Sequence, residues 1–300
     1  MEKWLHQSVI DRKKWDHMVH QTENASVFCL SFYLDSTAED WYAYTDEQFS
    51  FAIPVPVSVK LGIPGVYPPL FHREVSALGN IKNIDWNGFE SALLKRFPRG
   101  TYQIKSNTLQ KPKSKKLVYQ RLNKEIYSLK SQARRQLKKF EESALTIKFG
   151  TDSAVLTEVI IRILGKKLNL NNKEGETLRN LVSAAEEKKI LRTVGIFENE
   201  KLSGGLIALT YKNTTLYLKG ACEEHNMEKG GMYAAMNALI IKSFEEGQDF
   251  DFGGSRVEGV RFFNTRFSGE DHHYFQYHWE NGPHWFKLAQ HFRTWIKKQS

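Results

Sequence analysis

Acidic and aromatic residues alternate near the C-terminus of the chain, and two glycines follow them at once. The run D-F-D-F-G-G occupies residues 249–254. Alternation with a period of two predicts a strand that buries both phenylalanines on one face. Core packing accounts for the phenylalanines but not for Asp249 and Asp251, and Asp251 could cap nearby backbone N–H groups. Gly253 and Gly254 would permit a bulge or the close approach of another backbone.

The surroundings of several residues argue against three familiar kinds of catalytic or metal site. Ser255 follows the two glycines but lies outside a G-x-S-x-G elbow, which argues against a serine hydrolase. The D-F-G string lacks the glycine-rich loop, the strand lysine and the H-R-D motif of a kinase. His272 and His273 stand among aromatic residues and match no ligand spacing, so we expect no metal site. Cys29 and Cys222 form no C-x-x-C pair, which favours a reducing cytoplasm.

The composition indicates a globular chain with an anionic partner. Hydrophobic residues make up 41% of the 300 residues, which is enough for a sizeable core. No apolar run reaches transmembrane length, and charges interrupt the N-terminal residues too often for a secretory signal. The formal net charge of +9 fits nucleic acid, a phosphorylated cofactor, a lipid pyrophosphate or an acidic membrane surface.

The first part of the chain predicts a small mixed α/β unit. Pro54 and Pro56 should hold their extended segment at a sheet edge or outside a regular ladder. Residues 63–74 are punctuated by Pro and Gly and predict a loop. We expect a helix at 11–20, extended segments at 27–34 and 51–63, a helix at 86–97 and a strand at 101–107.

A basic, proline-containing stretch at 109–118 predicts a domain boundary, with halves at 1–117 and 118–300. The second half opens with a long helix pattern at 123–142, whose apolar positions recur every three or four residues. The following elements are expected in order: a strand at 145–149, helices at 153–164 and 174–188, three meander strands at 189–221, a loop at 223–231, a helix at 232–247, a strand at 249–252, a helix at 258–268, a strand at 272–280 and a basic tail helix at 284–298.

Basic side chains cluster on the helix predicted at 123–142. Arg134, Arg135, Lys138 and Lys139 fall close together on its polar side. For any single lysine a solvated face is the simpler explanation, whereas the clustering favours a surface that faces an anion. Both interpretations stay open at this point.

The order of elements in the second half resembles the GNAT N-acyltransferase fold. In that fold, the loop after the fourth strand and the start of the next helix hold a pyrophosphate, because backbone N–H groups and the helix dipole favour an anion. Lys229, Gly230 and Gly231 form a degenerate version of the family motif Q/R-x-x-G-x-G/A. An ordinary turn into a helix is the structural alternative for these residues.

The stretch 248–279 is similar to the Fem-type branch of the GNAT superfamily. A strand ending in D-F-G-G and a G-hydrophobic-x-x-F-x-x-x-F segment carry this resemblance. The branch includes aminoacyltransferases that build peptidoglycan cross-bridges, and its members carry two GNAT-like halves. The resemblance therefore implies an α/β fold with mixed sheets, in tandem halves with a cleft between them. Asn264 stands where the branch often has a lysine near the acyl donor, which weakens the case for a tRNA donor.

The resemblance also implies roles for individual residues. Asp251 would lie in the acyl-transfer site, where it accepts a proton from the attacking amine or orients that amine. The residues implied for the donor are Lys219, Gly220, Lys229, Gly230, Gly231, Gly253, Gly254 and Arg266. Those implied for the acceptor or another substrate are Tyr67, His72, Arg73, Arg134 and Arg135.

The activity implied is transfer of an acyl or aminoacyl group to an amine, on a small molecule or a cell-wall precursor. Acyl-CoA or aminoacyl-tRNA would be the donor, acyl-CoA serving as a co-substrate with no cofactor bound permanently. Positioning supplies much of the rate of aminolysis and backbone N–H groups can stabilise the oxyanion, so this chemistry needs no nucleophile–base pair. The expected location is the cytoplasm, and the tail helix would pack on the first half or lie on an anionic membrane.

A second class of function stays open beside the transferase. The degenerate glycine loop and Asn264 would also suit a catalytically silent GNAT-like protein that binds an anionic ligand.

Overall fold

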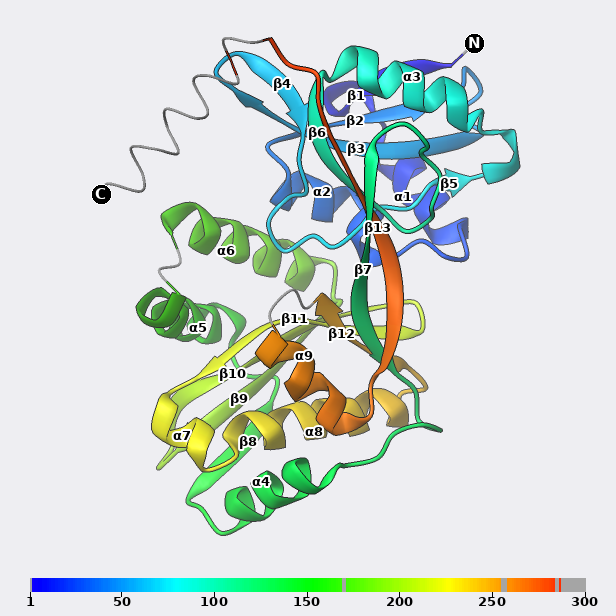
Figure 1. Cartoon of the computed structure of the whole chain (residues 1–300). Coiled ribbons are helices and arrows are strands. Elements are labelled where there is room, and N and C mark those ends of the chain that lie inside the picture. The colour runs from blue at the N-terminus through cyan, green and yellow to red at the C-terminus, as the bar shows by residue number, and fades with distance from the viewer. Residues whose placement is uncertain (1, 169–170, 255–257, 284–285, 287–300) are drawn as a thin grey trace. The chain divides into compact units, whose positions relative to one another are not determined.

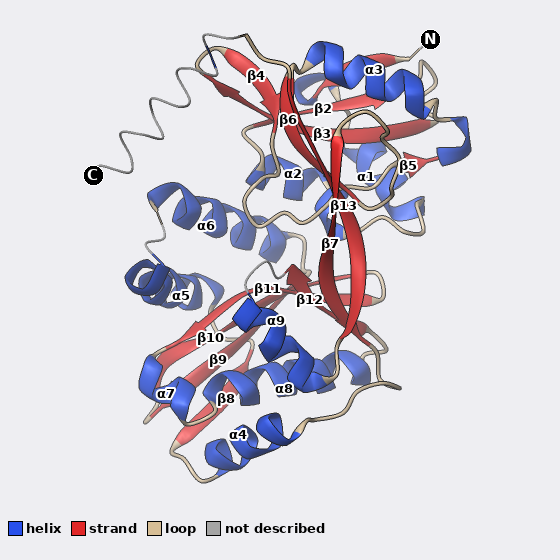
Figure 2. Cartoon of the chain, in the orientation of Figure 1, coloured by secondary structure: helices blue, strands red, loops and turns tan. Residues whose placement is uncertain are grey.

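The computed structural model describes residues 2–168, 171–254, 258–283 and 286. The chain divides into two compact units, Met1–Leu117 with Tyr274–Ser300, and Val118–His273. Each unit has a mixed sheet covered by helices, which gives a mixed α/β fold as predicted (Figures 1 and 2). Ser255 and, apart from Phe286, the tail helix predicted at 284–298 lie outside the described residues.

The first unit contains a sheet in the order β1-β2-β3-β4-β6-β13, with β5 beside β3. Neighbouring strands are antiparallel, except that β4 and β6 are parallel. Its strands are β1 (Lys3–His6), β2 (Asp40–Thr45), β3 (Phe51–Lys60), β4 (Ile63–Val66), β5 (Leu78–Gly79), β6 (Arg99–Ile104) and β13 (Glu270–Glu280), the last from Tyr274 onward. Its helices are α1 (Arg12–Gln21), α2 (Ser31–Thr37) and α3 (Trp86–Arg96).

Helix α1 shows why the predicted helix at 11–20 forms. Asp11 Oδ1 accepts the backbone N–H of Lys13 at 2.8 Å and so satisfies a donor at the helix start. Trp15 and Val19, four residues apart, are fully buried. The Trp15 ring lies 4.8 Å from that of Trp41 on β2, which fixes the helix against the sheet.

The extended segment predicted at 27–34 is wrong. The chain forms a 3-10 turn at Val27–Cys29 and then α2, which starts at Ser31. Asp16 of α1 accepts both the backbone N–H and the hydroxyl of Ser31, each at 2.8 Å, and thus caps α2 from a neighbouring helix. The first four residues of α2 are all buried, so the sequence offers no helical period to detect.

The second predicted extended segment contains both β3 and the start of β4. Pro54 and Pro56 lie inside β3, which pairs with β2 on one side. On its other side, β3 pairs with β5 at residues 51–52 and with β4 from Val57, so both prolines fall in the gap between these partners. The Pro54 carbonyl accepts a hydrogen bond from the Tyr102 hydroxyl there, at 2.9 Å. The expectation that the prolines lie outside a regular ladder is confirmed on this side.

The second unit contains a sheet in the order β7-β12-β11-β10-β9-β8, antiparallel except for the β11–β12 pair. Its strands are β7 (Lys113–Leu122), from Val118 onward, β8 (Leu145–Phe149), β9 (Leu191–Glu198), β10 (Lys201–Tyr211), β11 (Thr214–Cys222) and β12 (Asp249–Gly254). Its helices are α4 (Ser131–Glu141), α5 (Ser153–Leu168), α6 (Asn172–Glu187), α7 (Glu224–Glu228), α8 (Gly231–Glu245) and α9 (Glu258–Asn264).

A hydrophobic core lies between α8 and the second sheet. Phe250 and Phe252 of β12 are buried there, with ring centroids 5.0 Å apart, as the alternating pattern predicted. Met236 and Leu239 of α8 pack against the same core. The strand at 145–149, the helices at 153–164, 174–188 and 232–247 and the meander are confirmed to within about one turn.

The long helix predicted at 123–142 is wrong in its first part. Helix α4 begins at Ser131. Asn123 Oδ1 accepts the backbone N–H of Ile126 at 3.0 Å, which closes a turn in place of the first helical residues. The basic stretch before it is also more than a linker, because β7 occupies most of it and pairs with β12.

Candidate functional site

Strands β11 and β12 separate partway along their length. They pair in parallel at three positions, the last of which joins Leu216 to Asp251. The register of β11 against β10 shifts just beyond, which leaves Leu218 as an extra, bulged residue. The described parts of β11 and β12 make no further pairs. We call the opening between residues 217–220 of β11 and residues 252–254 of β12 the fork.

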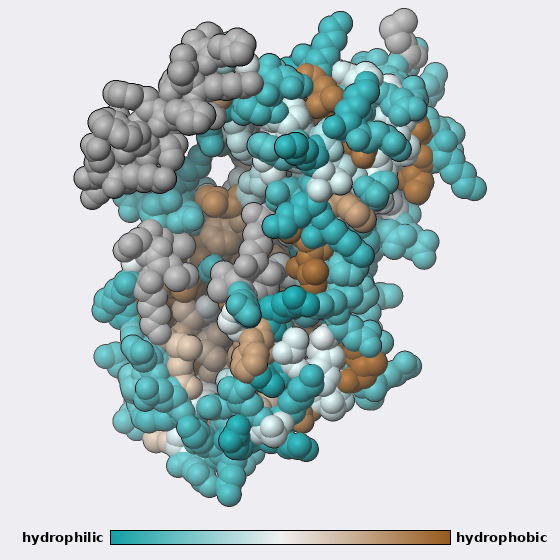
Figure 3. Space-filling model, in the orientation of Figure 1, coloured by the Kyte–Doolittle hydropathy of each residue, from teal (hydrophilic) through white to brown (hydrophobic). Residues whose placement is uncertain are grey.

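The fork exposes part of a strand that would otherwise be central. Residues 217–220 are half-buried, whereas the two residues on either side of them in β11 are buried. Figure 3 shows apolar surface, in brown and tan, in a hollow of the second unit over β10 and β11. Because strand backbone groups are strong donors and acceptors, a fork of this kind can hold an extended ligand by main-chain hydrogen bonds.

Asp251 and Gly253 shape one arm of the fork. Asp251 is 4% exposed, and its Oδ1 accepts the backbone N–H of Gly253 at 2.9 Å. Gly253 has φ +76°, which favours glycine, and a Cβ there would lie 2.8 Å from the Tyr217 carbonyl oxygen. The capping role considered for Asp251 is therefore present in the structure, and its role in proton transfer stays a prediction.

Lys219 and Gly220 lie on the opposite arm. Lys219 is half-buried, and burial lowers the pKa of its amine, while the carboxylate of Glu174 on α6 acts in the other direction. A Cβ at Gly220 would lie 2.8 Å from the backbone carbonyl oxygen of Gly205, so this position requires glycine. The structure thus places four predicted residues, Lys219, Gly220, Gly253 and Gly254, on the two arms of one fork, and a fifth, Asp251, at its edge.

The turn before α8 owes its residue types to packing. Gly230, the N-cap of α8, has φ +84°, and a Cβ there would lie 2.0 Å from the carbonyl oxygen of Gln136 on α4. A Cβ at Gly231 would also be in tight contact with its neighbours. Lys229 Nζ lies 2.5 Å from Glu198, and this hydrogen bond is the main reason that the pKa of Glu198 falls to about 2. The start of α8 is therefore held by α4 and β9.

Arg266 and Asn264 lie around α9 and the turn after it. The Arg266 guanidinium is 3.5 Å from the ring centroid of Phe262, and its charge opposes the burial that raises the pKa of Tyr233 in α8. Asn264 is fully buried and donates through Nδ2 to Gln120 on β7 at 3.1 Å. Asn264, which stands where the resemblance would place a lysine, is here turned into the interior.

The remaining predicted residues belong to other elements. Arg134 and Arg135 are exposed on α4, whose Ala133 is buried. In the first unit, His72 Nε2 lies 3.0 Å from the Phe28 carbonyl oxygen, and burial lowers the pKa of this imidazole to about 4. Arg73 is buried and pairs with the neighbouring Glu74. Tyr67 is half-buried, with the Arg99 guanidinium over its ring.

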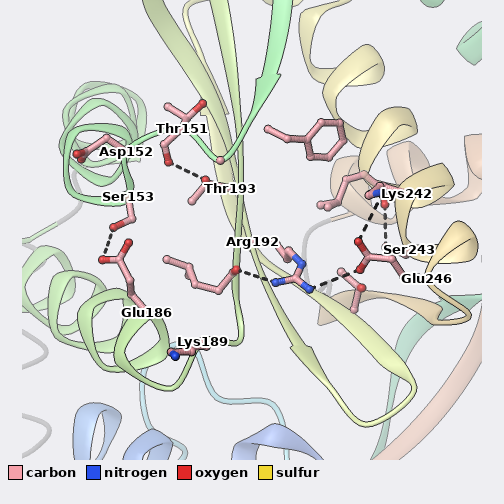
Figure 4. Close-up of a pocket in the computed structure, with 15 residues that line it drawn as sticks. Thr151, Asp152, Ser153, Glu186, Lys189, Arg192, Thr193, Lys242, Ser243 and Glu246 are labelled. Carbon is pink, nitrogen blue, oxygen red and sulfur yellow. Dashed lines mark hydrogen bonds and ion pairs between the residues drawn. The ribbon is translucent and has the colours of Figure 1, made fainter.

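Two features were not predicted from the sequence. Leu218 has no glycine or proline beside it that would signal a bulge. The second is a cavity of about 460 Å³ between α5, α6 and α8 (Figure 4). Ser153 donates to Glu186 at 2.8 Å there, and Arg192 pairs with Glu246 at 3.5 Å. Among the described residues that line the cavity, every buried side-chain nitrogen or oxygen atom has a hydrogen-bond partner. The lining therefore contains no unsatisfied polar group that would point to a ligand.

The sheet order, the bulge and the fork define a GNAT-type fold in the second unit. No family model and no curated protein matches the chain. A solved structure of FemX is similar, with a TM-score of 0.63 at 11% identity, over 92% of this chain and 97% of that chain. The C-terminal domain of a putative lysylphosphatidylglycerol synthetase from Agrobacterium fabrum has a TM-score of 0.61 at 11% identity, over 94% and 95% of the two chains.

A tandem GNAT protein from the clavulanic acid biosynthesis pathway is also similar, with a TM-score of 0.51 at 10% identity, over 94% of this chain and 99% of that chain. At such identities the likeness concerns the fold. The chain has a tandem GNAT fold of the Fem-like kind, which confirms the fold predicted from the sequence. Within its described residues, no helix has the length and apolar character needed to cross a bilayer.

Proposed function

We propose that the chain transfers an acyl or aminoacyl group to an amine and holds the donor in the fork of the second unit. The observation that carries this proposal is the separation of β11 and β12 after Leu216 and Asp251. It leaves strand backbone at residues 217–220 available to an extended acyl donor. The likeness of the whole chain to tandem GNAT structures supports the same reading.

The proposed reaction needs little covalent help from the protein. The amine nitrogen bonds to the acyl carbon, and the thiol or hydroxyl of the donor leaves with the electron pair of the broken bond. The proton lost by the amine passes to Asp251, at the edge of the fork, or to water. Orientation in the fork supplies most of the acceleration, and backbone N–H groups stabilise the oxyanion.

The donor in this proposal is acyl-CoA or aminoacyl-tRNA, and the acceptor is an amine on a small molecule or a cell-wall precursor. The inward turn of Asn264 favours acyl-CoA, because no lysine stands at that position to meet a charged tRNA end. We propose a cytoplasmic location for this activity.

A silent binding protein is the second candidate. Asn264 favours it, because this buried side chain donates to Gln120 and leaves no lysine at the position that the resemblance assigns to the acyl donor.

A panel of acyl-CoAs and charged tRNAs, tested by thermal shift and then by turnover with small amines, separates these functions. A transferase should show both stabilisation and product. Stabilisation without product would establish the silent binder, and neither effect would overturn both proposals. Lys219→Met should weaken donor binding several-fold, whereas the matched Lys201→Met, at an exposed position at the start of β10, should not.

A further inference from the structure

A buried arginine in the first unit has two nitrogen atoms without a hydrogen-bond partner among the described residues. Arg99 opens β6 and is 1% exposed. Within the described residues, its Nε and Nη1 atoms have no hydrogen-bond partner. Its Nη2 atom lies 3.5 Å from the Ile63 carbonyl oxygen, which is the outer limit of a hydrogen bond. A guanidinium stays charged in proteins, so this is a buried cation whose N–H groups are largely unsatisfied.

Two aromatic rings flank the Arg99 guanidinium. The ring centroid of Phe286 lies 4.0 Å from its central carbon, and that of Tyr67 lies 5.1 Å away. Phe286 is itself fully buried. Aromatic faces attract the positive charge, but they do not accept the in-plane N–H groups of a guanidinium. The burial of the charge is therefore only partly compensated.

The charged residues near Arg99 include one further cation, Lys60, and one acid, Glu280. Lys60 Nζ lies 4.3 Å from the ring centroid of Tyr67. Glu280 is opposite Arg99 in the β6–β13 ladder, and its Oε1 accepts the backbone N–H of Gly282 at 3.4 Å. Glu280 Oε1 is thus engaged by its own turn, and no ion pair joins this acid to Arg99 among the described residues.

Arg73 shows how the same unit satisfies a buried arginine. Arg73 is 6% exposed, and its guanidinium bonds through two nitrogens to the carboxylate of Glu74. A bidentate pair of this kind satisfies the N–H donors of the guanidinium and offsets the cost of burying its charge. The contrast indicates that Arg99 lacks an anion that its geometry could accept.

We propose that Arg99 binds an oxyanion of a ligand, a carboxylate or a phosphoryl group, and that Phe286 is the side chain that moves aside to admit it. Nε and Nη1 lie on different edges of the guanidinium, so the anion would take one of them together with Nη2, which gives up its long contact with the Ile63 carbonyl oxygen. Tyr67 would keep its face against the guanidinium. The site lies in the first unit, so the proposal goes beyond the function assigned to the fork and does not depend on it.

Thermal unfolding of the full chain tests this proposal, with inorganic phosphate and acetate titrated against chloride at constant ionic strength. Phosphate or acetate should raise the melting temperature saturably, and the stronger of the two identifies the anion. Phe286→Ala should lower the half-saturating concentration at least threefold. Arg99→Met should abolish the response, whereas Arg96→Met, which removes an exposed arginine that also stacks on aromatic rings, should retain it.

The melting temperatures of the same variants without added anion provide a second test. Arg99→Met should melt at a higher temperature than the parent, because an unsatisfied buried charge is replaced by an apolar chain of similar length. A lower melting temperature, or an anion response that survives in Arg99→Met, would overturn the proposal. If Arg99→Met fails to fold, an unchanged half-saturating concentration in Phe286→Ala overturns it. These readouts involve no acyl transfer, so they stand whether or not the fork is an active site.

Discussion

Asp251 can serve two purposes with one carboxylate, and the two can be separated. Its Oδ1 holds the Gly253 N–H, a contact that an asparagine could also make. A proton acceptor, in contrast, requires the charge. The structural role therefore survives Asp251→Asn, and the proposed chemical role does not.

We predict that Asp251→Asn lowers turnover by roughly 100-fold or more while donor affinity stays within about threefold, because general-base contributions are of that order. Asp251→Ala should also lose about 1 to 2 kcal/mol of stability with the lost hydrogen bond. Asp249→Asn, on the same strand, is the matched control. Steady-state kinetics and urea unfolding measure both effects. Parent-like turnover in Asp251→Asn would show that the Asp251 carboxylate takes no part in proton transfer, and its role would then be structural.

His72 should make the protein sensitive to mild acid. Its pKa in the folded chain is about 4, below the ordinary value of about 6.5, because burial disfavours the imidazolium. Between these values the unfolded chain binds the extra proton, so stability rises with pH across this window and is independent of His72 above it. The full effect is at most roughly 3 kcal/mol.

Urea unfolding at pH 4.5 and pH 7.5 checks this expectation. His72→Gln should reduce the difference in stability between the two pH values, whereas His17→Gln, at an exposed position of α1, should keep it. A parent protein equally stable at both pH values would contradict the prediction.

At the scale of elements, the start of α8 depends on its contact with α4. Gly230 and Gly247 both have a positive φ, but a Cβ at Gly230 would strike α4, while one at Gly247 meets no atom within 4 Å. Gly247→Ala should cost about 1 to 2 kcal/mol for its backbone conformation. Gly230→Ala should cost roughly twice as much, because α4 must also move. If urea unfolding gives the two variants equal losses in the free energy of unfolding, then α4 moves away from residue 230 at no measurable cost.

The elements differ in how much the sequence reveals of them. Helices with one polar and one buried face show a helical period in the sequence and are predicted well, as for α1, α3, α5, α6 and α8. Helix α2 begins with four buried residues and is capped by Asp16 from another helix, which local patterns cannot show. The D-F-G-G run does predict a break in the sheet at Gly253. The bulge at Leu218 that completes the fork depends on pairing between strands and has no local signal.

At the scale of the whole molecule, the net charge of +9 should favour polyanions, with α4 as a concentrated source. We predict that changing Arg134, Arg135, Lys138 and Lys139 to Gln weakens tRNA or heparin binding and flattens its salt dependence, since fewer counterions are released. A filter-binding series over salt concentration measures both quantities.

The control removes the same charge elsewhere, by changing Lys13, Lys14, Lys115 and Lys116, all exposed, to Gln. Equal effects of the two sets would assign the binding to net charge rather than to α4.

The first unit is assembled from two distant parts of the chain, because β6 pairs with β13 from Phe275 to Glu280. On the ribosome, β6 emerges well before its partner, and at ordinary synthesis rates the delay is roughly ten seconds or more. During that time one edge of β6 can recruit other strands. The interval between the synthesis of β6 and that of β13 should therefore be the time at which this protein is most prone to aggregate and most dependent on chaperones.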